Sequence, residues 1–227
     1  MKTIYLLTKE GWAPFDFDVE VTKEELSKRN IGIGDGARIG NRATIGNRAT
    51  IGYRATIGNG ATIGNGATIG GGATIGDGAT IGYRATIGYR ATIGDGATIG
   101  NRATIGDGAR IGYRASIGDE ATIGNRATIG DGATIGNRAT IGNRATIGYE
   151  ATIGNGARII KSIFITGTKH TVNWYGTGVI HIGCHCKKID WWEKNYKMIG
   201  EKEGYSEVEI TEYYGYIQIC EMLQKII

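Results

Sequence analysis

The residue types most often used in catalysis and metal binding lie at one end of the chain. All three His and all three Cys fall within residues 160–227, and residues 33–159 contain neither type. His170, His181 and His185 are therefore the only imidazoles, the side chains that exchange protons most readily near neutral pH. Any acid–base chemistry carried by His is predicted for this C-terminal segment.

The stretch HIGCHC, residues 181–186, combines two His with two Cys, which are ligands that suit zinc. Side chains alternate along a strand, so His181 and His185 would face one side while Cys184 and Cys186 face the other. All four would converge only if the strand ended inside the motif. We therefore expect no metal and no cofactor, and we favour a buried structural Cys beside an exposed His.

The middle of the chain is a repeat that must provide the scaffold. Ile recurs every six residues from Ile33 to Ile159, in 21 hexads of the form Ile-Gly-x-x-Ala-x. A helix does not explain a period of six, and the Gly content opposes one. In a short Thr-Ile-Gly strand, Ile points inward and its neighbours outward. The two x residues then turn a corner, where Asn, Asp and Gly suit positive φ angles.

This hexad resembles the hexapeptide repeat of left-handed parallel β-helix proteins over residues 31–159. The resemblance implies three hexads per coil, a triangular prism and commonly a homotrimer. With 18 residues per coil, the 21 hexads make seven coils. Left-handed winding is implied by the resemblance alone, because the general rule for parallel crossovers predicts the opposite hand.

Non-repetitive segments flank the repeat and are expected to cap it. Residues 1–30 predict strands at 2–8 and 17–21, then a short helix from 22 to about 30 that a capping box begins. Covering the first coil would protect its open strand edges. Residues 160–227 predict strands at 161–167 and 170–184, and two helices at about 190–203 and 206–226 broken by Gly204.

The predicted fold is thus an all-β solenoid with three segments. They are an N-terminal α/β cap at 1–30, a left-handed β-helix at 31–159, and a C-terminal cap of strands and a helical hairpin at 160–227. The C-terminal cap resembles the tails of hexapeptide proteins encoded by phages.

One edge of the predicted prism offers a candidate anion site. Every third hexad lies on the same edge, which places Tyr53–Arg54, Gly71–Gly72 and Tyr89–Arg90 one above another. Two coils separate the two Tyr, roughly 9.6 Å at the usual strand spacing. Aromatic walls with an Arg on each side suit a planar anion. The alternative is that Tyr and Arg are simply bulky, soluble corner residues.

Resemblance and residues together give the functional hypotheses. Many hexapeptide-repeat proteins are acyltransferases whose base is a His near a cleft between subunits, and residues 33–159 offer no such His. Our main hypothesis is therefore a non-enzymatic protein, a trimeric assembly or a binder of a small anionic or nucleotide-like ligand. The candidate contacts are Tyr53, Arg54, Gly71, Gly72, Tyr89, Arg90, His170, Asn173, Trp174, His181 and His185.

Two alternatives stay open. The first is a coenzyme A-dependent acyltransferase that uses a His of the C-terminal cap. The second is ice binding by the outward Thr ladders, which is disfavoured because Gly removes the second outward side chain from each strand.

Composition restricts partners and location. The net charge is +4 and acids interrupt the Arg rows, which argues against duplex nucleic acid. No apolar run reaches membrane-spanning length, and the N-terminus does not resemble a signal peptide. Three Cys cannot all pair with one another, so we expect a cytoplasmic protein, in a bacterial host cell if it is phage-encoded.

Overall fold

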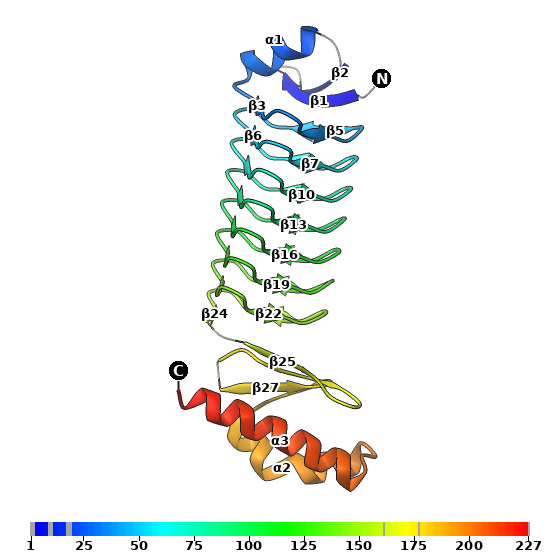
Figure 1. The fold of residues 1–227 in the computed structure, drawn as a ribbon, viewed down its shortest axis with the longest axis vertical. Helices are drawn as coiled ribbons and strands as arrows, with labels where there is room; N and C mark the ends of the chain where they lie inside the picture. Colours follow the sequence, from blue (N-terminus) through cyan, green and yellow to red (C-terminus); the bar gives the residue numbers. More distant parts are fainter. Residues whose placement is uncertain (1–2, 9–10, 17–19, 161, 177, 227) are drawn as a thin grey trace. The chain divides into compact units, whose positions relative to one another are not determined.

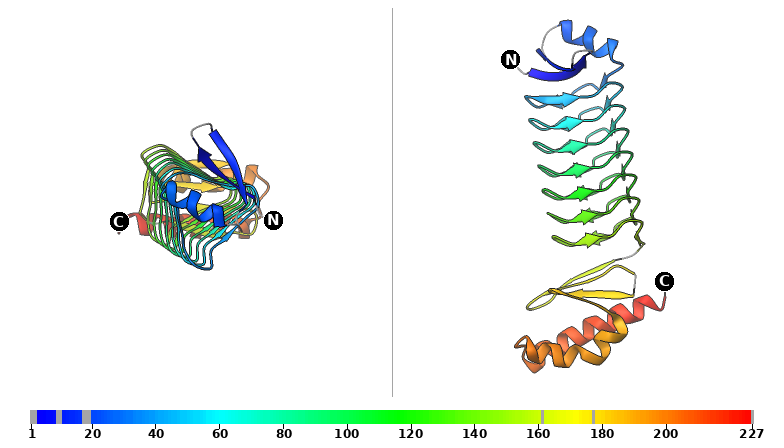
Figure 2. Two further views of the ribbon diagram at one scale, coloured as in Figure 1. Left: turned by 90° about the horizontal axis from the view of Figure 1, so that it is seen from above. Right: turned by 180° about the vertical axis from the view of Figure 1, so that it is seen from behind.

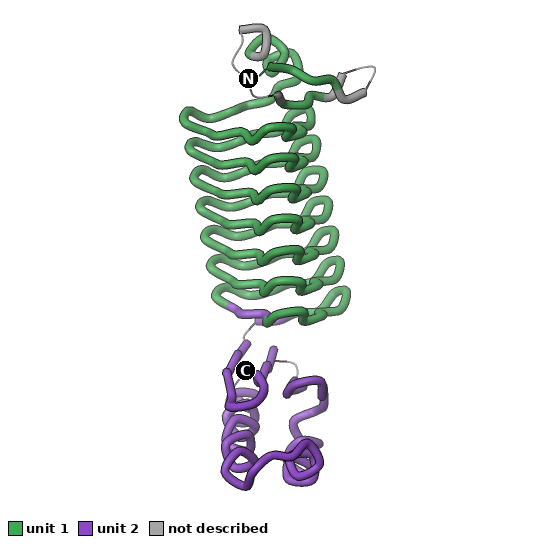
Figure 3. The backbone as a smooth tube through the Cα atoms, turned by 90° about the vertical axis from the view of Figure 1, so that its right-hand side faces the viewer, with its two compact units in different colours: residues 1–144, 148–158 green, residues 145–147, 159–227 purple. Residues whose placement is uncertain are grey.

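The computed structural model describes residues 3–8, 11–16, 20–160, 162–176 and 178–226. It contains two compact units, residues 1–144 with 148–158, and residues 145–147 with 159–227 (Figure 3).

The repeat forms seven coils built from three parallel sheets, as predicted (Figure 1). Viewed along the stack, the coils superpose into a three-sided outline (Figure 2). Strands pair with partners 18 residues away, such as Thr80 with Thr62 and Ile81 with Ile63. This register confirms three hexads per coil.

Most strands of the coils contain only two residues, and each sheet takes one strand from each coil. The nine-stranded sheet contains β5 (Ala43–Ile45), β8 (Thr62–Ile63), β11 (Thr80–Ile81), β14 (Thr98–Ile99), β17 (Ser116–Ile117), β20 (Thr134–Ile135) and β23 (Thr152–Ile153). The seven-stranded sheet contains β4 (Arg38–Ile39), β7 (Thr56–Ile57), β10 (Thr74–Ile75), β13 (Thr92–Ile93), β16 (Arg110–Ile111), β19 (Thr128–Ile129) and β22 (Thr146–Ile147). The eight-stranded sheet contains β3 (Gly32–Ile33), β6 (Thr50–Ile51), β9 (Thr68–Ile69), β12 (Thr86–Ile87), β15 (Thr104–Ile105), β18 (Thr122–Ile123), β21 (Thr140–Ile141) and β24 (Arg158–Ile159).

The core of the coils is a stack of Ile flanked by Ala. The repeat Ile side chains from Ile39 to Ile147 are at most 2% exposed, and the outward Thr are partly or fully exposed. Burying one such Ile contributes roughly 1.5–3 kcal/mol before chain entropy is counted. The inward-Ile register predicted from the hexad is therefore correct.

The corners differ from the sequence expectation. Positive φ falls on the second corner residue, which is Gly, Arg or Glu, for example Arg42 at 58° and Gly78 at 62°. Asn and Asp occupy the first corner for a different reason. Their Oδ1 accepts the backbone N–H of the first corner residue one coil earlier, as Asp95 does from Asp77 at 2.9 Å.

Two strands and a helix precede the first coil. β1 (Thr3–Thr8) pairs antiparallel with β2 (Gly11–Asp16) and parallel with β5, so it extends the nine-stranded sheet. The strand expected at 17–21 is wrong at residues 20–21, which lie in the helix that follows, and residues 17–19 lie outside the described residues. Helix α1 (Glu20–Lys28) begins before Thr22, so that residue lies inside the helix and does not cap it.

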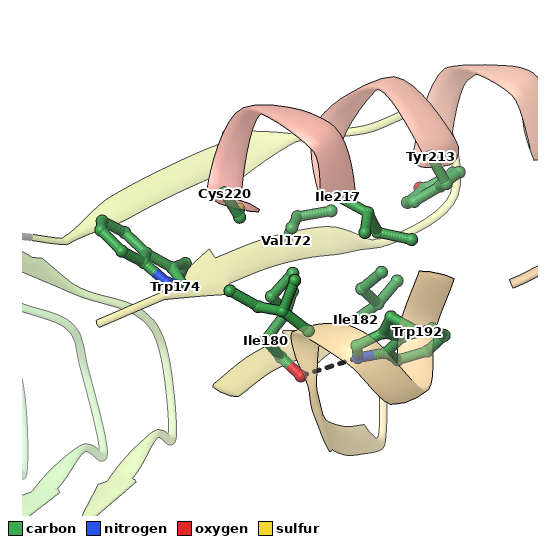
Figure 4. Close-up of a cluster of buried hydrophobic side chains, with 9 residues drawn as sticks. Val172, Trp174, Ile180, Ile182, Trp192, Tyr213, Ile217 and Cys220 are labelled. Carbon is green, nitrogen blue, oxygen red and sulfur yellow. Dashed lines mark hydrogen bonds between the residues drawn. The ribbon is translucent and has the colours of Figure 1, made fainter. Parts of the chain in front are cut away.

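The second unit contains an antiparallel sheet of β25 (Ile163–Thr166), β26 (Thr171–Trp174), β27 (Val179–Ile182) and β28 (His185–Lys188), in that order. Helices α2 (Ile189–Lys202) and α3 (Glu207–Gln224) follow, close to the predicted bounds. One face of the sheet packs on them through a shared core (Figure 4). That core contains Val172, Trp174, Ile180, Ile182, Ile189, Trp192, Tyr213, Ile217 and Cys220.

Local sequence explains where α3 starts. The Ser206 hydroxyl accepts from the Glu209 backbone, and the Glu209 carboxylate accepts from the Ser206 backbone, which is a complete capping box. No helix in the described part of the chain is both long and apolar enough to cross a membrane.

Candidate functional site

The second unit contains an apolar cavity between its sheet and its helices. The apolar lining includes Ile182, Trp192, Ile199, Ile210 and Ile217. Two of the three predicted His, His170 and His185, also line it, together with Glu203. The cavity therefore combines an apolar wall with ionisable groups, the composition expected of a small-molecule site.

His185 is the best-positioned imidazole in this cavity. It is the first residue of β28, and its Nε2 lies 3.4 Å from Oε1 of Glu203, the C-cap residue of α2. The ring of Trp192 stands edge-on to the imidazole, with centroids 6.2 Å apart and planes at 81°. A carboxylate on one ring nitrogen fixes the orientation of the ring and leaves Nδ1 to exchange a proton.

His170 reaches the same cavity from the loop before β26. Its backbone carbonyl accepts from the Tyr213 hydroxyl at 2.8 Å, and its backbone N–H donates to the same oxygen. Its ring lies 6.0 Å from that of Tyr205, and burial raises the pKa of Tyr205 to about 12. The Tyr205 hydroxyl is therefore neutral at physiological pH, and the Tyr205 side chain forms part of the cavity wall.

The motif HIGCHC does not form one strand. β27 ends at Ile182, a turn at Gly183 and Cys184 follows, and β28 begins at His185. His181 and His185 consequently point to opposite faces of the sheet, which corrects the expectation that they share one. His181 Nε2 instead lies 3.2 Å from Sγ of Cys186, its partner across the hairpin.

The expected burial of the cysteines is also wrong. Cys184 and Cys186 are exposed, and the buried thiol is Cys220 in α3, where burial raises its pKa to about 11. Within the described ranges, no three His, Cys, Asp or Glu gather as a metal-ion site would require.

Trp174 and Asn173, the other two contacts predicted in the C-terminal cap, lie in different environments. Trp174 is 1% exposed and its Nε1 donates to Gln224 Oε1 at 3.3 Å, so it belongs to the core and cannot meet a ligand at the surface. Asn173 pairs with His181 across β26 and β27 and lies on the same face as Cys186.

The six corner residues of the predicted notch do share one edge of the first unit. The Gly72 N–H donates to the Tyr53 carbonyl, and the Arg90 N–H donates to the Gly71 carbonyl. Each Arg lies over the ring of the Tyr that precedes it, 4.9 Å from its centroid in both hexads. The guanidinium groups are therefore already engaged in cation–π contacts, and anion binding at this notch stays a prediction.

Comparison with family models decides what the coils are. The model described as bacterial transferase hexapeptide (six repeats) matches residues 54–89, 102–137 and 114–149. The model described as hexapeptide repeat of succinyl-transferase matches residues 72–111. The β-helix is a hexapeptide-repeat domain. The left-handed parallel β-helix expected from the resemblance is confirmed by these models and by the three parallel sheets of the coils, whereas the phage resemblance of the cap stays a prediction.

Several solved structures are similar to part of this chain. The acetyltransferase domain of PglB from Neisseria gonorrhoeae, in complex with acetyl coenzyme A, is 20% identical over 56% of this chain and 53% of that domain, with a TM-score of 0.43. PerB from Caulobacter crescentus, in complex with CoA and GDP-perosamine, is 16% identical over 58% of this chain and 61% of PerB, with a TM-score of 0.43. The UDP-N-acetylglucosamine acyltransferase of Francisella novicida is 18% identical over 82% of this chain and 76% of that enzyme, with a TM-score of 0.48.

The chain spans about half the length of the PglB domain and about three-fifths of PerB. The comparison with curated proteins gives no match.

The main functional hypothesis is corrected by these findings. Both family models that match the hexapeptide-repeat domain are named for transferases. A non-enzymatic assembly or ligand-binding protein is therefore the wrong main hypothesis. The absence of His from the coils led to the error, because it was given more weight than the repeat itself.

Sequence reasoning missed the partners of two His. Glu203 lies 18 residues after His185 in the sequence. The two meet only because α2, which follows β28, packs so that its C-terminal end lies near the start of that strand. The pairing of His181 with Cys186 had a signal, since Gly183 could have been recognised as part of a two-residue turn. Its φ of 58° is the conformation that such a turn requires.

Proposed function

We propose that the chain is an acyltransferase that takes an acyl group from a thioester of coenzyme A, with His185 as the general base. The observation that carries this proposal is the contact of His185 with Glu203 at the wall of an apolar cavity. The transferase names of the matching repeat models support the reaction class.

The geometry suggests how the proton moves. Glu203 accepts from Nε2–H of His185, which leaves Nδ1 as the basic nitrogen. Nδ1 takes the proton of an acceptor hydroxyl or amine as that group attacks the thioester carbonyl. The C–S bond of the donor then breaks, and the departing thiolate receives the proton from the imidazolium. The Glu203 carboxylate stabilises the imidazolium while it exists.

We also propose that the protein is a homotrimer, the assembly implied by the hexapeptide repeat, and that it acts in the cytoplasm. The flat Thr-lined faces of the coils support close packing between subunits. The three Cys are free thiols, as a reducing compartment maintains them.

A thiol-release assay with acetyl-coenzyme A tests the activity. The acceptors should be a panel of sugar nucleotides with a free amine or hydroxyl group. His185→Gln and Glu203→Gln should each lower the turnover number, the former by about 100-fold or more. Glu201→Gln, an exposed carboxyl on the same helix, is the matched control and should turn over like the parent. If His185→Gln released thiol at the parental rate, His185 would not be the base.

A further inference from the structure

A second set of reactive side chains lies on the opposite face of the C-terminal sheet. Asn173 on β26, His181 on β27 and Cys186 on β28 are direct partners across three neighbouring strands. Directly opposed residues of antiparallel strands point to the same face with Cβ atoms about 4.5–5.5 Å apart. The sheet therefore places an amide, an imidazole and a thiol in one row.

The imidazole and the thiol are in contact. His181 Nε2 lies 3.2 Å from Cys186 Sγ, within the range of a hydrogen bond to sulfur. Tyr175 packs edge-on against the His181 ring, with centroids 5.6 Å apart and planes at 65°. Burial lowers the pKa of His181, so its imidazole is neutral at physiological pH. In the tautomer with its proton on Nδ1, Nε2 accepts from the Cys186 thiol. A neutral base beside a thiol is what general-base activation of a nucleophile requires.

The amide completes the row. Oδ1 of Asn173 is buried and has no hydrogen-bond partner in the part of the chain that the structure describes. It belongs to the residue directly opposite His181, whose Nε2 is turned toward Cys186. An Nδ1–H on His181 would supply the donor that this oxygen lacks if the two side chains turned toward each other. Such a bond would keep Nε2 unprotonated and directed at the sulfur.

The thiol is accessible and lies in a groove of mixed character. Cys186 is exposed, and the groove beside it is lined by Val179, Cys186, Lys187, Lys188, Asp190 and Trp191. The Lys187 ammonium lies 5.3 Å from the centroid of the Trp191 ring. Two Lys against one Asp favour a substrate that carries an anionic group, and the Trp191 ring offers an apolar surface beside it.

We propose that Cys186 is a nucleophile that accepts an acyl group from an anionic acyl thioester, with His181 as its base and Asn173 as a positioning residue. The Cys186 thiol gives its proton to His181 Nε2 as its sulfur bonds to the donor carbonyl carbon. The donor C–S bond breaks, and the departing thiolate takes the proton from the imidazolium. The product is an acyl thioester on Cys186 and a free donor thiol. This site shares no residue with the cavity of His185 and Glu203.

Intact-mass spectrometry of the full chain incubated with acetyl-coenzyme A tests the proposal, with peptide mapping to locate the acetyl group. We expect acetylation at Cys186 in the parent and in Cys184→Ser, the neighbouring exposed thiol, and none in Cys186→Ser. His181→Gln should slow acetylation of Cys186 about 100-fold or more. Asn173→Ala should slow it less, and Asn173→Asp should restore part of the rate.

A second measurement separates activation from damage to the fold. The rate of Cys186 alkylation by iodoacetamide should fall as the pH drops through the lowered pKa of His181 in the parent, and His181→Gln should lose that step. Equal labelling of Cys184 and Cys186, or unchanged acetylation in His181→Gln, would overturn the proposal. Glu203→Gln should lower turnover with an acceptor without changing Cys186 acetylation, so the two proposals fail independently.

Discussion

At the scale of single residues, the three His of the chain have three different environments. His170 is exposed at the end of a loop, His185 contacts a carboxylate in the apolar cavity, and His181 is half-buried against a thiol and a Tyr ring. Burial opposes the charged form of the His181 imidazole and lowers its pKa. This residue therefore connects the stability of its unit to pH.

The sign of that pH dependence follows from the direction of the shift. The pKa of His181 is lower in the folded chain than its ordinary value of 6.5, so the unfolded chain binds more protons in the interval between them. The stabilising contribution is fully present above pH 6.5 and is lost as the pH falls through the folded pKa. Thermal unfolding of the parent, followed by Trp fluorescence, should therefore show a lower melting temperature under mildly acidic conditions.

His181→Gln should flatten this part of the pH profile, and His170→Gln, at an exposed position, should keep the profile of the parent. A His181→Gln variant whose melting temperature falls with acid as steeply as that of the parent would show that other groups carry the dependence.

At the scale of the coil, the Gly after each Ile is explained by contact between neighbouring coils. A Cβ built on Gly82 would lie 2.6 Å from the backbone carbonyl carbon of Gly100 in the next coil, closer than real Cβ contacts permit. Gly154 holds the same place in the last coil, and a Cβ there would have no atom within 4 Å. The two positions are equivalent in the hexad and differ only in what stacks above them.

Gly82→Ala should therefore destabilise the coils by about 1–3 kcal/mol, because the backbone of the next coil must shift to make room. Gly154→Ala is the matched control and should melt like the parent. Circular dichroism during thermal unfolding measures both. Equal melting temperatures for the two variants would mean that stacking does not impose Gly at this position.

The coil was predictable because every hexad encodes one strand and one corner within six residues. The period placed Ile inward, and the resemblance gave the number of sides. The second unit was predictable only in part, since Ser206 and Glu209 marked the start of a helix but nothing local joined His185 to Glu203. The catalytic hypothesis depended on that long-range contact. The face assignment of His181 failed for a local reason, because one turn at Gly183 reverses the strand.

At the scale of the whole molecule, the outward side chains distinguish the three faces of the coils. Arg38 and Arg110 replace Thr on the seven-stranded sheet, and Arg158 does so on the last strand of the eight-stranded sheet. The coil strands of the nine-stranded sheet carry only Thr and, at Ser116, Ser on the outside. A face without charge is the one that a subunit interface can bury at least cost, because burying an unpaired Arg is strongly unfavourable.

We therefore predict that the proposed trimer buries the nine-stranded face. Thr98→Arg places a charge at the middle of that face and should convert the trimer to smaller species, as measured by light scattering and native mass spectrometry. Thr74→Arg makes the same substitution on the seven-stranded face, two coils before Arg110, and should leave the trimer intact. Both Thr are exposed within their own chain, so neither change disturbs the Ile core. If Thr74→Arg dissociated the trimer and Thr98→Arg did not, the interface would lie on the seven-stranded face despite its two Arg. A parent chain that measures as a monomer would contradict the proposed trimer itself.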